Sequence, residues 1–244
     1  ISHTHYVMPP IGLGYLAAAL RRGGFDEVVI LDCVKEGLSF NGFRGFLERI
    51  KPRIVGFQIF SYDFDSVVKS IEIVKQLNHE TKVLIGGAHV SATSALALEE
   101  IKQADYGFVG EGEIGLPMLA GRLLRDEQIP LENIPGLIWR ENSSIRENAR
   151  TGVEDLDSLG FQPWDLMPPA SYPDNPQGGF YKRFPIAPIS TTRGCPYLCT
   201  FCGSGVNMGH KLRFRSIDHV LDEMVMLRND YGVGEFHIID DMFN

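Results

Sequence analysis

Three of the four cysteines in this 244-residue chain lie within a stretch of eight residues. Cys195, Cys199 and Cys202 form the pattern CxxxCxxC, while Cys33 stands alone. Thiolates are soft ligands that bind iron–sulfur clusters or zinc. Four cysteines are too few for the disulfide framework of a secreted scaffold. The three clustered thiols therefore predict a metal site in a cytoplasmic protein.

Two kinds of metal centre fit this pattern. Three cysteines so spaced can hold one face of a [4Fe-4S] cubane, which leaves the fourth iron open to a further molecule. Alternatively, His210 would complete a tetrahedral zinc site. The spacing favours the cluster. Zinc ligands usually come in two closely spaced pairs, whereas three residues separate the first two cysteines here.

The elements that must position these residues follow a βα pattern. Apolar periodicity predicts helices at residues 11–22, 40–50, 64–77, 94–102 and 116–124. Short apolar runs predict strands at residues 27–32, 53–60, 82–85 and 106–109. Continuously apolar strands are buried on both faces, which indicates a parallel, Rossmann-like sheet with flanking helices. We also expect Asp63 to cap its helix. Because the pattern opens on a helix, we expect a preceding strand to be missing, with residues 1–8 as the end of a loop.

The second half of the chain first loses this pattern and then resumes it. Residues 135–148 predict a hairpin with a turn at residues 142–144. Seven of the fourteen prolines lie between Pro163 and Pro188, which indicates an extended connector. A strand at 186–192, a cysteine loop at 193–213, a helix at 216–231 capped by Ser216 and a strand at 235–240 follow. We therefore predict domains at 1–130 and 186–244, joined by a hairpin and linker at 131–185.

Charge and hydropathy argue against two kinds of partner, nucleic acid and a lipid bilayer. The net charge of −8 disfavours nucleic acid as the main partner. The longest apolar runs have the length of strands, so we expect no membrane span.

The cysteine motif lies in a recognisable stretch. TTRGCPYLCTFCGSG resembles the cluster loop of radical S-adenosylmethionine (radical SAM) enzymes, and RFRSIDHVLDEMVML with FHIIDDMFN resembles the first helix and second strand of their partial (β/α) barrel. The resemblance implies that Cys195, Cys199 and Cys202 hold a [4Fe-4S] cluster whose fourth iron binds S-adenosylmethionine (AdoMet). Reductive cleavage then yields a 5′-deoxyadenosyl radical. It also implies an electron donor such as flavodoxin or ferredoxin and a small-molecule or biosynthetic-intermediate substrate.

The same resemblance assigns AdoMet contacts. Phe201 would lie near the adenine, and Gly203 would let the backbone approach the cofactor. Asp240 and Asp241 stand where the family contacts the methionine moiety, although many members have a glycine-rich triplet there. Either aspartate could face the cofactor, and both could also form a solvated strand end.

Glycines cluster at three of the four strand ends expected in the N-terminal domain, near residues 9–14, 86–89 and 110–113 but not at 61–62. Ligands of open parallel sheets bind beyond the carboxyl ends of the strands, although tight turns also favour glycine. PPIGLGYLAAAL, GGAHVS and VGEGE resemble the cobalamin-binding class of radical SAM enzymes. The resemblance implies a cobalamin site built from Pro10, Gly12, Gly14, Ser61, Tyr62, Gly86, Gly87, His89, Gly110, Glu111 and Gly112.

The sequence departs from many cobalamin-binding domains at the residue that binds cobalt. Many cobalamin domains carry DxHxxG, whose histidine binds cobalt, but Val34 stands at the histidine position of the partial match from Asp32 to Gly37. We therefore expect no protein histidine on cobalt, and a lower face that is open or covered by a side chain such as Tyr62. His89 is interpreted as a polar contact to the corrin, or alternatively as a hydrogen-bonded loop histidine. Cys33 is predicted to be buried at a strand end.

The leading hypothesis is a cobalamin-dependent radical SAM enzyme that methylates an unactivated carbon or performs an oxidative cyclisation. A radical SAM enzyme without cobalamin and a zinc-stabilised binding module are the alternatives. Six βα units need roughly 190 residues, whereas 42 residues follow Cys202. We therefore expect this segment to hold the first βα units of an incomplete barrel, and to bind cobalamin better than it catalyses.

Overall fold

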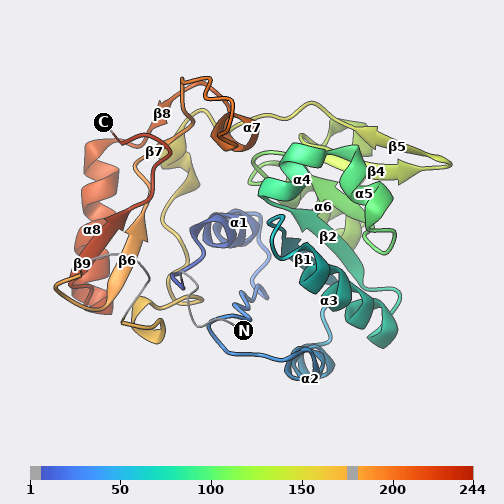
Figure 1. The fold of residues 1–244 in the computed structure, drawn as a ribbon, viewed down its shortest axis with the longest axis horizontal. Coiled ribbons are helices and arrows are strands. Elements are labelled where there is room, and N and C mark those ends of the chain that lie inside the picture. Colours follow the sequence, from blue (N-terminus) through green and yellow to red (C-terminus); the bar gives the residue numbers. More distant parts are fainter. Residues whose placement is uncertain (1–6, 175–180, 244) are drawn as a thin grey trace. The chain divides into compact units, whose positions relative to one another are not determined.

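The computed structural model describes residues 7–174 and 181–243, which form two compact units (Figure 1). The first unit comprises Ile1–Gly37, Glu154–Cys195 and Lys211–Asn244. The second unit comprises Leu38–Val153 and Pro196–His210. Each unit is therefore assembled from segments that are separated in the sequence, and the cysteine loop is divided after Cys195. The consecutive domain boundaries at residues 130 and 185 stay predictions.

A five-stranded sheet forms the centre of the second unit. Three of its strands, β1 (Ile54–Gln58), β2 (Lys82–Gly86) and β3 (Tyr106–Phe108), are parallel. The hairpin of β4 (Leu137–Glu141) and β5 (Ser144–Glu147) adds antiparallel to β3. The parallel sheet is confirmed. The hairpin, which the sequence pattern assigned to the connecting segment, extends this sheet.

Helices cover both faces of the sheet of the second unit. They are α2 (Phe40–Ile50), α3 (Phe64–Leu77), α4 (Ala88–Thr93), α5 (Ala95–Glu100), α6 (Gly115–Arg125) and the 3-10 turn η1 (Leu131–Asn133). Leu84 and Phe108 pack with Leu119 of α6, whereas Val83 and Ile85 are buried on the opposite face because side chains alternate along a strand. The bounds of α2 and α3 are those predicted. The helix predicted at 94–102 is confirmed as the shorter α5, whereas α4, which Ser94 at φ 52° separates from it, was not predicted.

Two caps were predicted, and one of them is wrong. Ser216 caps its helix by accepting a hydrogen bond from the amide of His219 at 3.2 Å. Asp63 makes no such bond to α3; its carboxylate instead accepts from the amide of Phe60, at 2.9 Å. Partial burial in this turn raises the pKa of Asp63. The carboxylate is thus used to close the turn after β1.

The first unit contains helix α1 (Ile11–Arg22) and the second βα pattern. β6 (Ile186–Ile189) pairs parallel with β9 (Glu235–Ile238), and β7 (Thr192–Arg193) pairs antiparallel with β8 (Arg213–Phe214). Helix α8 (Ile217–Tyr231) packs Leu227 onto Ala187 and Ile189. The connector supplies Trp164 and Met167 to the same core, with short 3-10 turns η2 (Leu156–Leu159) and η3 (Pro169–Ser171).

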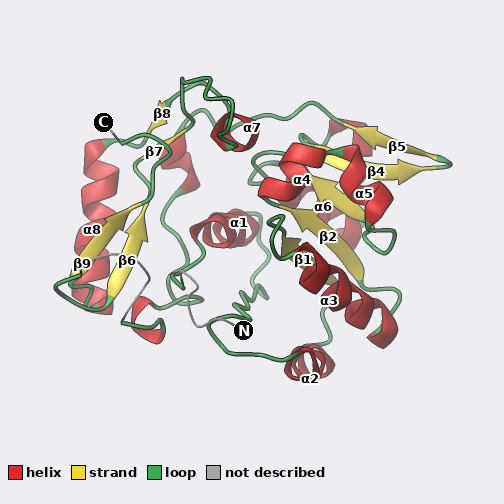
Figure 2. Cartoon of the chain, in the orientation of Figure 1, coloured by secondary structure: helices red, strands yellow, loops and turns green. Residues whose placement is uncertain are grey.

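The strand predicted at residues 27–32 is wrong. This run is drawn as loop in Figure 2, and among the described residues no strand pairs with it. Its apolar side chains differ in burial: Ile30 packs on the core of the first unit, whereas Val29 is 57% exposed. Asp32 then accepts from the amides of Val34 and Lys35 and closes a turn. Cys33 in this turn is exposed, so its predicted burial is also wrong.

The predicted strand at 186–192 is interrupted after Ile189, and the predicted loop at 193–213 contains helix α7 (Ser204–Met208) and the first residue of β8. Residues 1–6, to which the predicted entry loop extends, lie outside the described residues. Within the described part of the chain, the helices are too short and too polar to cross a bilayer.

Candidate functional site

The cysteine loop begins directly after β7. Its first cysteine, Cys195, follows Gly194, which has φ 90°. Farther along, the amide of Cys202 donates to the carbonyl of Cys199 at 3.1 Å, which makes a tight turn between these two cysteines. Both residues are exposed, and none of the four cysteines forms a disulfide. The loop therefore presents reduced thiols at the surface.

The thiols do not form a closed metal site by themselves. Among the described residues, no three His, Cys, Asp or Glu side chains converge as metal ligands. Cys195 belongs to the first unit, whereas Cys199 and Cys202 belong to the second. His210, the ligand expected for zinc, lies with its ring against Gly205 of α7. The fit to an iron–sulfur cluster rests on the chemistry of the donors, which are three thiols outside any disulfide on one short loop.

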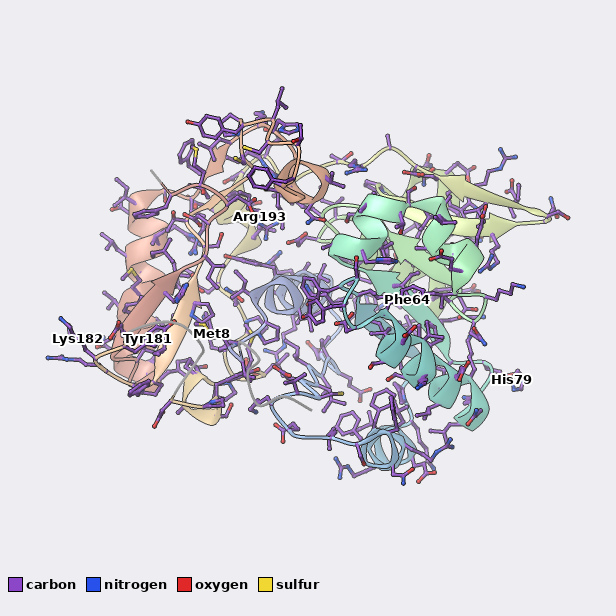
Figure 3. The ribbon with its side chains drawn as sticks, in the orientation of Figure 1. Met8, Phe64, His79, Tyr181, Lys182 and Arg193 are labelled. Carbon is purple, nitrogen blue, oxygen red and sulfur yellow. The ribbon has the colours of Figure 1, made fainter. Side chains whose placement is uncertain are left out.

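Arg193 marks the end of β7, two residues before Cys195. Its guanidinium lies 4.6 Å from the ring centroid of Tyr15 on α1, and the residue is only 7% exposed (Figure 3). A cation over an aromatic face is favourable when it is desolvated. This contact holds the strand that leads into the cysteine loop against α1 within the first unit.

Two of the residues predicted to contact AdoMet have free space around them. Phe201 is 91% exposed, and a Cβ added at Gly203 would meet no atom within 4 Å. The space needed for an aromatic contact and for close backbone approach is therefore present at both positions. Their roles toward AdoMet stay predictions.

The two aspartates after β9 differ in their surroundings. The carboxylate of Asp240 accepts from the amides of Thr191 at 2.8 Å and Thr192 at 3.1 Å, and from the hydroxyl of Thr191. These bonds close the bend between β6 and β7. Asp241 is exposed. The geometry thus makes Asp240 a positioning residue for the strand end before the cysteines and leaves Asp241 available to a ligand.

Replacing Asp240 by Ala should therefore lower the stability of the first unit by about 1–3 kcal/mol, because three donors lose a charged acceptor. Asp241→Ala, the matched control one residue away, should change stability by less than about 0.5 kcal/mol. Urea unfolding of both variants measures this difference. Equal effects of the two substitutions would contradict the assignment.

Three loops meet beyond the carboxyl ends of β1, β2 and β3 in the second unit. The amide of Ile59 donates to the carbonyl of Gly86 at 2.8 Å, and the amide of His89 donates to the carbonyl of Ile59 at 3.1 Å. Ser91 accepts from the amide of Gly110 at 2.9 Å. Gly87 has φ 95°, and an added Cβ would lie 3.0 Å from the backbone of Ile59. The loops are therefore held in one arrangement by their own backbone.

His89 is the polar side chain of these loops with unused hydrogen-bonding capacity. Its Nδ1 lies 3.0 Å from Oγ of Ser61, and its ring lies 5.0 Å from that of Phe64. Its Nε2 is buried and has no hydrogen-bond partner among the described residues. An unpaired buried donor or acceptor is costly, so this atom indicates a place for a ligand atom. Tyr62, 81% exposed, stacks on Phe60 at 5.5 Å.

The other predicted cobalamin residues have structural contacts of their own. Glu111, 8% exposed, accepts from the amide of Val153 at 3.1 Å, and Gly112 is buried beside it. Pro10, Gly12 and Gly14 belong to the first unit. There, a Cβ at Gly14 would overlap Gln162 and Met167, so close packing accounts for this glycine. The structure brings together Ser61, Gly86, Gly87, His89 and Gly110, and the role of the whole set stays a prediction.

Helix α7, which sequence analysis did not predict, joins the cysteine loop to these loops. It packs against α4, and the guanidinium of Arg150 donates to the carbonyl of Val206. Oγ of Ser204 and Oδ1 of Asn207 are buried without a hydrogen-bond partner in the described part of the chain. No pattern pointed to them, because a five-residue helix is too short for a visible apolar period.

A hollow of about 420 Å³ lies at the other end of the sheet, lined by His79, Lys102, Asp105 and Arg140 among others. Figure 3 shows Phe64 and His79 at opposite ends of α3. Lys75 pairs with Asp105 at 2.6 Å, and Arg140 donates to the carbonyls of Leu98 and Ile101. These charged side chains therefore already have partners within the protein. The hollow is also remote from the carboxyl ends of the strands, where ligands of such sheets bind.

Comparisons with known proteins agree with this arrangement. Residues 1–120 match the model of the B12 binding domain. The chain is 32% identical over 239 residues to an uncharacterized methyltransferase of Pyrococcus horikoshii, covering 96% of this chain and 49% of the relative. It is 27% identical over 240 residues to an anaerobic magnesium-protoporphyrin IX monomethyl ester cyclase of Rubrivivax gelatinosus, covering 96% of this chain and 41% of that one. The chain thus spans about half the length of the curated relatives it matches.

A solved structure shows the same fold. It is the radical S-adenosylmethionine methyltransferase TsrM from Kitasatospora setae with cobalamin and a [4Fe-4S] cluster bound, with a TM-score of 0.73 at 23% identity over 98% of this chain and 46% of that chain. Residues 1–120 accordingly resemble B12 binding domains, and the chain shares its fold with this cobalamin-binding radical SAM methyltransferase.

Proposed function

We propose that this chain binds cobalamin, a [4Fe-4S] cluster and AdoMet as part of an enzyme that methylates an unactivated carbon or performs an oxidative cyclisation. One observation supports this most directly. Helix α7, which follows Cys199 and Cys202 by a few residues, packs on α4, which carries His89 at the carboxyl end of the parallel sheet. Residues 196–210 of the predicted cluster loop and the predicted cobalamin loops after β1, β2 and β3 therefore share one compact unit.

The chain's own residues have distinct tasks in this proposal. Cys195, Cys199 and Cys202 supply three thiolates to the cluster, and Phe201 presents an open aromatic face to the adenine of AdoMet. The loops at Ser61, Gly86 and Gly110 present backbone groups to the corrin. His89 holds a proton on Nε2 when Ser61 donates to Nδ1, and so donates to an acceptor on the ligand.

When bound, the cluster supplies the electron that cleaves AdoMet, and cobalamin supplies a methyl group or a second redox centre. No protein histidine is expected on cobalt, and Val34, at the histidine position of the partial motif, is 58% exposed. Whether the product is methylated or cyclised is a separate question. Product analysis answers it, because a methyltransferase forms S-adenosylhomocysteine together with the methylated product.

Anaerobic purification followed by metal analysis tests the cluster. We expect about four irons and four sulfides per chain, as a [4Fe-4S] centre requires. One zinc with neither iron nor sulfide would support the zinc-stabilised binding module instead. The cytoplasmic location, the electron donor and the absence of a nucleic-acid partner stay predictions.

Titration with hydroxocobalamin, followed by absorbance, tests the second cofactor. We expect a saturable spectral shift, and we expect His89→Ala to raise Kd about 3- to 10-fold because one hydrogen bond is lost. His79→Ala is the matched control, since His79 lies beyond the opposite end of α3 (Figure 3). A wild-type chain that shows no shift would instead be a radical SAM protein whose N-terminal domain does not bind cobalamin.

A further inference from the structure

We propose that α7 of the cysteine loop is itself part of the cobalamin site, where Ser204 and Asn207 act together with His89 to bind a carboxamide of the ligand. This inference rests on the proposed function and adds residues that no sequence motif indicated. It also gives the cysteine loop a role in holding cobalamin, separate from its role toward the cluster.

The first step concerns unsatisfied atoms. Buried polar atoms are nearly always hydrogen-bonded in folded proteins, so each exception calls for an explanation. Oγ of Ser204, Oδ1 of Asn207 and Nε2 of His89 are all buried and lack hydrogen-bond partners among the described residues. Two lie on α7 and one on α4, and these two helices pack against each other in the second unit.

The second step places α7 beside the loop after β3. The backbone carbonyl oxygen of Asn207 lies 3.7 Å from the position of an added Cβ at Gly110. The amide of Gly110 in turn donates to Ser91 of α4 at 2.9 Å. Arg150, which also adjoins Gly110, holds α7 through the carbonyl of Val206. The unpaired side chains of α7 are therefore anchored at the carboxyl ends of the strands, where a ligand of this sheet binds.

The third step is the chemistry of the missing partner. Nε2 of His89 is a donor when Ser61 donates to Nδ1, Oδ1 of Asn207 is an acceptor, and the hydroxyl of Ser204 can act as either. A primary carboxamide has one carbonyl acceptor and two N–H donors, which complements this set. The periphery of the corrin ring carries several such amides, whereas an inorganic anion, which offers acceptors alone, matches the set less completely.

A consequence follows for the cysteine loop. If cobalamin binds to Ser204 and Asn207, its binding free energy is linked to the order of the loop that contains Cys199 and Cys202. Such linkage is reciprocal at equilibrium. Cobalamin should therefore protect residues 196–210 from amide exchange even in protein that holds no cluster.

The test compares Ser204→Ala and Asn207→Ala with Val206→Ala, a control on the same helix whose side chain is 40% exposed. Titration of the cluster-free chain with hydroxocobalamin should give a Kd that is raised about 3- to 10-fold in each of the first two variants. The Val206 variant should bind as the wild type does. Removing an unpaired buried polar atom should leave the thermal midpoint of the free protein unchanged or raised, so misfolding does not explain a weaker Kd.

Hydrogen exchange of the same proteins gives a second readout. We expect cobalamin to slow exchange at residues 196–210 in the wild type and in Val206→Ala, and to lose this effect in the Ser204→Ala, Asn207→Ala double variant. Unchanged Kd and unchanged protection in the double variant would overturn the inference while leaving the proposed function standing. A wild type that does not bind cobalamin would overturn both.

Discussion

Replacing Cys199 by Ala should abolish the iron–sulfur absorbance and AdoMet cleavage, and should leave cobalamin binding to the second unit intact. A [4Fe-4S] centre with only two protein thiolates is not retained, since thiolate ligation holds the cluster. The exposed side chain of Cys199 contributes little to the core, and its carbonyl, which accepts from Cys202, remains in the variant. We therefore expect the loss to be chemical rather than structural.

Cys33→Ala is the matched control, because Cys33 is the fourth cysteine and is exposed in the turn after Asp32. Its iron and sulfide content should equal that of the wild type. The measurements are iron and sulfide analysis, visible absorbance after anaerobic reconstitution, and circular dichroism for the fold. A Cys199→Ala protein that keeps a full complement of iron would show that the cluster ligands have been assigned incorrectly.

Replacing Glu223 by Ala should destabilise the first unit by about 3–5 kcal/mol, because it would leave Arg215 buried without its counter-ion. The two side chains are 0% and 2% exposed, and Oε2 of Glu223 lies 2.7 Å from Nη2 of Arg215. Oε1 of Glu223 also accepts from the indole of Trp164 at 3.0 Å. Arg215 donates to the carbonyl of Ser190 at 2.9 Å, so this pair joins α8, the connector and the strand that leads to Cys195.

The stability experiment is thermal or urea unfolding, followed by tryptophan fluorescence, to which Trp164 contributes from the first unit and Trp139 from the second. A loss of 3–5 kcal/mol corresponds to roughly 6–20 °C in the melting midpoint at this chain length. Asp222→Ala is the control, because it removes an exposed carboxylate from the neighbouring position of α8. A midpoint for Glu223→Ala that matches this control would show that the ion pair does not stabilise the unit. Glu223→Gln, which keeps an acceptor for Trp164, should fall between the two.

Much of the local structure is determined by the sequence. Helices α1, α2 and α3 lie at the predicted residues because their apolar residues repeat at the helical period. Ser216 forms the predicted cap because its hydroxyl lies three residues before the amide that it accepts from. The parallel order of β1, β2 and β3 agrees with the expectation from their continuously apolar sequences. The cysteine pattern carried the family resemblance without any tertiary information.

Contacts between distant residues explain what sequence analysis missed. Residues 27–32 are as apolar as a strand, but a strand also needs a hydrogen-bonded neighbour, and the described residues provide none. Asp63 has the type of a cap, yet the turn after β1 uses its carboxylate. Asp240 and Asp241 are identical in type and adjacent, and only the bend at Thr191 distinguishes them. Their different roles depend on hydrogen bonds across almost fifty residues.

The sequence by itself thus determined the candidate ligand residues, the parallel sheet and the family resemblance, because motif spacing and apolar period are local properties. The tertiary structure alone decided which polar atoms are already satisfied. It assigned Glu111 and Asp240 to structural hydrogen bonds, and left His89, Ser204 and Asn207 buried with unpaired atoms in the described part of the chain. Hydrogen-bond satisfaction depends on the packing of distant segments such as α4 and α7, which no local pattern records.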